Sequence, residues 1–196
     1  SPKPLSPGLS RAELYAMGKA LRDKVPRVAH AKWLPPRKRA DPLELILAAN
    51  KGRIPELVPI RHGRMLRSPF TLYRGAALNM AADLAGTPVT GLRVQACGDA
   101  HLCNFGAFAT PERRMIFDIN DLDETLPAPW EWDVKRLAAS IVVASRSNGF
   151  GRRDARDATL ACVRSYREHM ADLSEMRVLD VWYESIPIEK ILSTVK

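Results

Sequence analysis

Three oxygen-bearing side chains in the middle of the chain have types and spacing that suit a divalent cation. Asp99 follows an alternating apolar and polar run over 92–97, which is typical of a half-buried strand, and Asn104 comes five residues later. Asp118 ends a later apolar run. Carboxylate and amide oxygens are the ligands that Mg²⁺ prefers. We therefore expect Asn104 and Asp118 to bind the ion and Asp99 to act as a base.

A predicted β-hairpin would bring these groups together. Two apolar-rich runs flank the segment TPER at 110–113, whose proline stands at the second position of a type I turn. If the strands pair symmetrically about this turn, Phe105 lies opposite Asp118. Asn104 and Asp118 would then lie side by side at the open end of the hairpin, near Asp99.

Acidic residues are concentrated around the same hairpin. Six of the 22 acidic residues fall between positions 118 and 133, and closely packed carboxylates repel one another unless a cation is present. An EF-hand loop beginning at Asp118 is excluded, because its fifth and sixth positions are Leu122 and Asp123 instead of an oxygen ligand and a glycine. A zinc site is excluded as well, since His101 and Cys103 have no second cluster of ligands.

The order and spacing of these residues resemble the protein-kinase-like superfamily. Its aminoglycoside phosphotransferase branch has a loop of the form H-G-D-x-H-x-x-N, where this chain reads CGDAHLCN at 97–104. The motifs SPFTLYRGAA, GDAHLCNFG, FDINDLDETLP, PWEWDVKRLAAS and LDVWY together resemble a bacterial family called domain of unknown function 2252. The resemblance extends from about Leu14 to the end of the chain.

This resemblance implies Mg²⁺-dependent transfer of a phosphoryl group from ATP to a hydroxyl group of an unknown small molecule or protein. The site residues that follow from it are Arg74 for ATP, Asp99 and His101 for catalysis, and Asn104, Asp118 and Asp121 for Mg²⁺. Asp133 would brace the catalytic loop. The sequence has no G-x-G-x-x-G motif and no strand lysine. We therefore expect a truncated chain that is weakly active or inactive alone.

The expected fold is α+β and mostly helical, resembling a kinase-like C-lobe with a small catalytic hairpin and without the nucleotide-covering lobe. Apolar periodicity and start and stop signals predict helices over 10–24, 41–52, 55–66, 68–86, 130–148 and 152–173. The helix at 55–66 carries Arg61, His62 and Arg64. At 196 residues, the chain is long enough for one domain with a buried core.

Charge divides the chain into two parts. Residues 1–40 are rich in proline and hold ten Lys or Arg against Glu13 and Asp23, which accounts for the net charge of +8. We expect a basic leading segment with one helix at 1–40 and the catalytic-loop domain at 41–196. No apolar run is long enough to span a membrane and no signal peptide is recognisable, so the expected location is cytoplasmic.

Two other functions fit the same residues. In the first, the chain is a non-enzymatic module whose basic leading segment docks on nucleic acid or another acidic partner. In the second, the acidic loop and a water molecule carry out metal-dependent phosphoester hydrolysis. Nucleotide dependence and salt dependence separate these possibilities from phosphoryl transfer.

Overall fold

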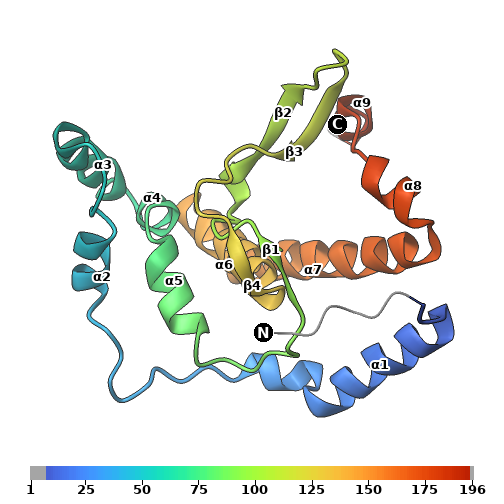
Figure 1. Ribbon diagram of the computed structural model, residues 1–196. Helices are drawn as coiled ribbons and strands as arrows, with labels where there is room; N and C mark the ends of the chain where they lie inside the picture. Colours follow the sequence, from blue (N-terminus) through green and yellow to red (C-terminus); the bar gives the residue numbers. More distant parts are fainter. Residues whose placement is uncertain (1–7, 195–196) are drawn as a thin grey trace.

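The computed structural model describes residues 8–194, and this part of the chain is mostly helical with two small antiparallel sheets, so the α+β expectation is confirmed (Figure 1). The helices are α1 Arg11–Lys24, η1 Arg27–Ala31, α2 Pro42–Ala48, η2 Pro55–Leu57, α3 Val58–Met65, α4 Pro69–Arg74, α5 Ala77–Leu84, η3 Leu102–Asn104, α6 Glu131–Ser147, α7 Arg152–Glu175, α8 Val178–Tyr183 and α9 Ile188–Leu192. The strands are β1 Arg93–Ala96, β2 Phe105–Ala109, β3 Met115–Ile119 and β4 Leu126–Pro129.

Side-chain caps begin several helices where the sequence predicted them. The Ser10 hydroxyl accepts a hydrogen bond from the backbone N–H of Glu13, whose carboxylate accepts one from the backbone N–H of Ser10 at 2.7 Å. Asp41 accepts a hydrogen bond from the backbone N–H of Leu43 at 2.7 Å, so that Pro42 opens α2. These contacts satisfy N–H groups that the first turn of a helix leaves without partners.

The prediction of one helix over 68–86 was wrong, because the chain breaks at Gly75 into α4 and α5. The carbonyl oxygen of Gly75 accepts a hydrogen bond from Arg61 Nη2 at 2.6 Å. A Cβ atom at position 75 would lie 2.6 Å from side-chain atoms of Met65. Tight packing against α3 therefore replaces the continuous helix that the apolar stripe predicted.

The predicted register of the β2–β3 hairpin was also wrong, by one residue. Phe105 lies opposite Ile119, and Asp118 lies opposite Gly106. The turn hydrogen bond from Arg113 N to the carbonyl oxygen of Thr110 is present at 2.8 Å. Arg113, however, adopts a left-handed conformation with φ +62° and adds a third residue to the loop. Such three-residue loops combine a type I turn with one left-handed residue, which moves the pairing by one position.

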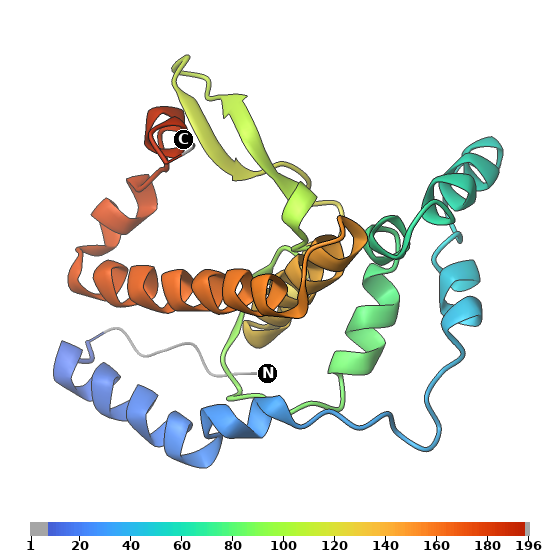
Figure 2. The same cartoon turned by 180° about the vertical axis from the view of Figure 1, so that it is seen from behind.

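The helices form arms around a central pair, α6 and α7, as Figures 1 and 2 show from opposite sides. Stacking of Trp130 on Tyr166, with ring centroids 6.0 Å apart, joins this pair. On one side α4 and α5 pack against α6 and lead to α3 and α2. On the other side α8 and α9 carry the chain back to β3, where the Phe117 N–H donates to the carbonyl oxygen of Ile186 at 2.8 Å.

The buried core is small, contrary to the expectation from chain length. The accessible surface is 14800 Å², whereas a compact monomer of this mass exposes about 9,300 Å². Among residues 8–194, the buried apolar residues are Met65, Leu84, Ala96, Cys97, Ala100, Ala128, Ala144 and Ala155. Several of them lie where the β1–β4 sheet and the following loop meet α6. Helices of the arms keep large apolar side chains exposed, including Val178 at 85% and Trp182 at 80%.

None of the helices between residues 8 and 194 is long and apolar enough to cross a membrane.

Candidate functional site

One face of α6 holds the loop that connects β1 to β2. Asp133, Arg136 and Ser140 follow one another at spacings of three and four residues, which places them on the same side of the helix. The carboxylate of Asp133 accepts hydrogen bonds from the backbone N–H groups of Cys97 at 2.7 Å and Gly98 at 3.1 Å. The prediction that Asp133 braces this loop is therefore confirmed.

Gly98 lets the loop turn sharply at the end of β1. Its φ of +80° lies in the left-handed region, which residues other than glycine rarely adopt. A Cβ atom here would lie 2.0 Å from the carbonyl oxygen of Glu124. Two separate constraints thus require glycine at this position, and both bring the loop against the segment that follows β3.

Ser140 fixes the far end of the same loop. The side chain of Ser140 is fully buried, and its hydroxyl accepts a hydrogen bond from the backbone N–H of Leu102 at 2.9 Å while donating to the carbonyl oxygen of Leu137 at 2.7 Å. The loop 97–104 is therefore anchored to α6 near both of its ends.

Asp99 is held by a buried arginine that the sequence did not single out. Asp99 Oδ1 accepts hydrogen bonds from Arg136 Nε at 2.8 Å and from Arg136 Nη2. Arg136 is only 2% exposed. Its guanidinium group also donates to the carbonyl oxygen of Tyr73 at 3.0 Å and lies over the Tyr73 ring at 4.6 Å. The Tyr73 hydroxyl donates in return to the carbonyl oxygen of Arg136 at 2.8 Å. Burial raises the pKa of Tyr73 to about 12, so the phenol remains a hydrogen-bond donor.

His101 lies beside Asp99 and is 5% exposed. Its Nε2 atom is 3.5 Å from Asp99 Oδ2. Burial lowers the pKa of His101 below its ordinary value, and the positive charges of Arg136 and Arg74 lower it further against the opposing effect of Asp99. The ring is therefore neutral near pH 7. Its Nδ1 atom is buried and has no hydrogen-bond partner among residues 8–194.

Asn104 connects the loop to the segment after β3. Its amide nitrogen donates to the carbonyl oxygens of Asp99 at 3.0 Å and Asp121 at 2.9 Å, and its amide oxygen accepts from the Asp121 N–H at 3.0 Å. The residue is 4% exposed. Because the amide oxygen is already engaged and the side chain is buried, Asn104 acts here as a structural clamp.

Asp118 and Asp121 occupy different environments. Asp118 is exposed on β3, and its carboxylate accepts a hydrogen bond from the neighbouring Ile119 N–H at 2.7 Å. Asp121 lines a cleft together with Asp99. Asp118 is therefore not among the residues that line this cleft, and the described residues contain no group of three or more His, Cys, Asp or Glu arranged to hold a metal ion. The donor set expected for the ion does not fit this geometry.

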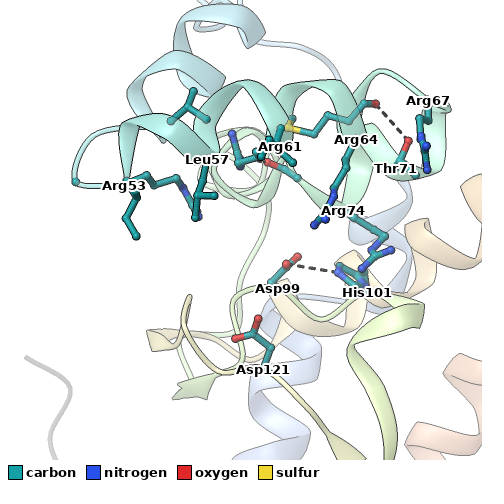
Figure 3. A pocket seen from close by; sticks show the side chains of 16 residues that line it. Arg53, Leu57, Arg61, Arg64, Arg67, Thr71, Arg74, Asp99, His101 and Asp121 are labelled. Carbon is teal, nitrogen blue, oxygen red and sulfur yellow. Dashed lines mark hydrogen bonds and ion pairs between the residues drawn. The ribbon is translucent and has the colours of Figure 1, made fainter.

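The cleft that contains Asp99, His101 and Asp121 has a volume of about 900 Å³ (Figure 3). Its opposite side is formed by the segment from residue 52 to residue 75, which includes η2, α3 and α4 with their connecting residues and contributes five arginines. We call these residues the arginine wall: Arg53, Arg61, Arg64, Arg67 and Arg74. We call the loop 97–104, with the α6 face that holds it, the floor. Arg74, the residue expected to contact ATP, is the member of the wall contributed by α4.

The five arginines differ in their partners. Arg61 donates to the Asn50 side chain at 3.1 Å, and Arg53 pairs with Glu124 at 3.3 Å. Arg64, Arg67 and Arg74 form no ion pair or side-chain hydrogen bond with any residue in the described range. Of these five arginines, only Arg74 was assigned a role from the sequence. The spacing of three residues between Arg61, Arg64 and Arg67 was the signal available for the others.

A smaller space of about 480 Å³ adjoins the cleft and has a lining of mixed charge. Asp123, Glu124 and Lys51 line only this smaller space. The charged residues that border both spaces are Arg53, Arg61, Arg74, Asp99 and Asp121. The site therefore has a basic end and a mixed-charge end that meet at Asp99.

The family described as an uncharacterized protein conserved in bacteria, DUF2252, matches residues 53–196. This range covers most of the chain and includes the arginine wall, the floor and α6, so the chain belongs to this family. No curated protein and no solved structure matches the chain.

Proposed function

We propose that the chain is a kinase-like phosphotransferase in which the cleft brings ATP and a hydroxyl-bearing acceptor together at Asp99. One observation carries the proposal: the Asp99 carboxylate, fixed in place by Arg136, faces the unpaired guanidinium groups of Arg64 and Arg74 across the cleft (Figure 3). Phosphoryl transfer depends chiefly on positioning and on neutralising phosphate charge, and this arrangement offers both.

Asp99 would orient the acceptor hydroxyl. Its Oδ1 atom is occupied by Arg136. Its Oδ2 atom, which lies 3.5 Å from His101 Nε2, is the oxygen that would accept from the substrate hydroxyl. The hydroxyl oxygen attacks the γ-phosphorus, its proton passes to Asp99, and the bond to ADP breaks. Arg74 lies close enough to lower the pKa of His101 and is placed to neutralise the transferred phosphoryl group.

Of the residues expected to bind Mg²⁺, only Asp121 lines the cleft. Asn104 is buried and its amide oxygen already accepts a hydrogen bond from the Asp121 N–H, and Asp118 does not line the cleft. We assign no catalytic step to the ion and propose Asp121 as the carboxylate on which binding of the ATP–Mg²⁺ complex depends.

Calorimetric titration with ATP and Mg²⁺ tests this proposal, with Asp121→Ala as the variant and Asp118→Ala as its matched control. Each variant removes one exposed carboxylate from the same segment. We expect wild type to bind, Asp121→Ala to bind at least about tenfold more weakly because a charged contact is lost, and Asp118→Ala to match wild type. Failure of wild type to bind ATP with Mg²⁺ overturns the proposal. Loss of binding only in Asp118→Ala would restore the metal set predicted from sequence.

The same preparations separate the two other functions. Phosphatase turnover that requires no nucleotide would indicate a hydrolase. Binding of nucleic acid that weakens steeply with salt, without any binding of ATP, would indicate a module that uses the basic leading segment.

A further inference from the structure

The two ends of the cleft differ in charge, and this difference bears on the acceptor. The basic end is lined by Arg64, Arg67 and His101 and does not include Asp123 or Glu124. The mixed-charge end includes both of those carboxylates, which offset its basic side chains, and excludes Arg64 and Arg67. A nucleotide bound with a divalent cation carries charges of both signs and suits the mixed-charge end. The basic end is then left for a second anion.

Arg64 and Arg67 are positioned to bind such an anion. Both lie near the C-terminal end of α3, and neither forms an ion pair with residues in the described part of the chain. Figure 3 shows Arg64 reaching from α3 toward Asp99 and Arg74. Guanidinium groups that share a cleft repel one another, and an anion between them removes that repulsion. Each also presents a planar fork of donors that matches phosphate oxygens.

A second feature of this end also lacks a partner. His101 Nδ1 is buried and makes no hydrogen bond within the described residues, although the ring lines the cleft. The neutral ring can donate or accept one hydrogen bond at this atom. Apolar side chains, including Leu57 and Ile60, line the same end and can cover a short carbon skeleton.

We infer that the acceptor is itself a phosphate monoester, whose phosphate is bound by Arg64 and Arg67 while its free hydroxyl lies at Asp99. This inference rests on the proposed phosphotransferase function, because the phosphate monoester is an acceptor only if a phosphoryl group is transferred to it. The anion site itself requires neither ATP nor Mg²⁺. A cleft of about 900 Å³ has room for a small phosphorylated compound beside the phosphates of a nucleotide.

Titration with inorganic phosphate, without nucleotide or Mg²⁺, tests the anion site. The double variant Arg64→Gln/Arg67→Gln removes both charges, and Arg153→Gln/Arg156→Gln on α7 removes two charges at the same spacing outside the cleft. The control side chains are 91% and 74% exposed. We expect phosphate affinity to fall at least about tenfold in the first variant, because charge-assisted contacts are lost, and to stay unchanged in the second. Equal affinities in both variants, or equal losses, overturn the inference.

Glycerol 3-phosphate, glycerate and glycerol then identify the group that is recognised. We expect glycerol 3-phosphate to bind most tightly and to lose this advantage in Arg64→Gln/Arg67→Gln. Glycerate binding as tightly as glycerol 3-phosphate would contradict recognition of a phosphate, and equal binding of glycerol would contradict an anion site.

Asp121→Ala distinguishes this inference from the proposed function. We expect it to keep phosphate affinity while losing affinity for ATP with Mg²⁺. If wild type binds phosphate through Arg64 and Arg67 but never binds ATP, the proposed function fails and the anion site stands. If ATP binds but phosphate affinity does not depend on the two arginines, the inference fails alone.

Discussion

The floor and the arginine wall of the cleft are stabilised in different ways. In the floor, Asp133, Arg136 and Ser140 each make hydrogen bonds to the loop, and all three lie on one helix face. In the arginine wall, Arg64 and Arg67 are exposed and have no acidic partner among the described residues. The floor therefore depends on its polar contacts for its shape, whereas the wall keeps its charges available for a ligand.

This difference predicts that equivalent substitutions have unequal effects on stability. Removing a polar group from the floor leaves buried partners without hydrogen bonds, which costs more than the bond contributed. Removing Arg64 or Arg67 from the wall leaves no partner without a hydrogen bond and relieves repulsion between like charges. The first two comparisons below each pair one floor position with one position on α3, the helix that carries Arg61 and Arg64 of the wall.

The largest effect is expected for Arg136→Met. The substitution keeps an unbranched side chain but removes the guanidinium group that pairs with Asp99, leaving that carboxylate unpaired at a largely buried site. We expect the free energy of unfolding to fall by about 3 kcal/mol, measured by urea denaturation with far-ultraviolet circular dichroism. Arg64→Met on the wall should change it by less than about 0.5 kcal/mol. Similar losses in the two variants would remove the distinction between floor and wall.

A smaller effect is expected for Gly98→Ala in the floor. The new Cβ would meet the Glu124 carbonyl oxygen at 2.0 Å, and φ at this residue is +80°. We expect a loss of about 2 kcal/mol or more in the same denaturation experiment. Gly63→Ala is the matched wall variant, because Gly63 lies within α3 and its Cβ would have no neighbour within 4 Å. This variant should gain up to about 0.8 kcal/mol from helix propensity. If both substitutions change the free energy of unfolding in the same direction, the loop can move away from Glu124.

Features that depend on local chemistry could be predicted from the sequence. Ser10 and Asp41 begin helices because their side chains hydrogen-bond to backbone N–H groups two or three residues away. The end of α6 before Gly149, with its φ of +80°, follows from the same kind of signal. The family and the bracing role of Asp133 came from motif resemblance, which local propensity alone would not supply.

Features that depend on tertiary packing could not be predicted in this way. Nothing in TPER indicates that Arg113 adopts a left-handed conformation, and that one residue moves Asp118 out of its expected pairing. Arg136 looks like an ordinary surface residue of a helix until the loop is placed over it. The arginine wall likewise depends on the break at Gly75, which turns one predicted helix into two.

His101 should give the floor a modest pH dependence. Burial lowers the pKa of His101 in the folded chain below its ordinary value of 6.5. Between the two pKa values, the unfolded chain therefore binds more protons at this residue than the folded chain does. The stability that the neutral His101 ring contributes is fully present above about pH 6.5 and is lost as the pH falls through the folded-state pKa. We expect the free energy of unfolding to decline on this acidic side in wild type and to decline less steeply in His101→Gln.

Burial also lowers the pKa of His30, so His30→Gln should remove a separate part of the decline. The double variant should show the smallest change in the free energy of unfolding with pH. An unchanged slope in His101→Gln would show that the ring gains a proton without cost and that the floor is open to water around it.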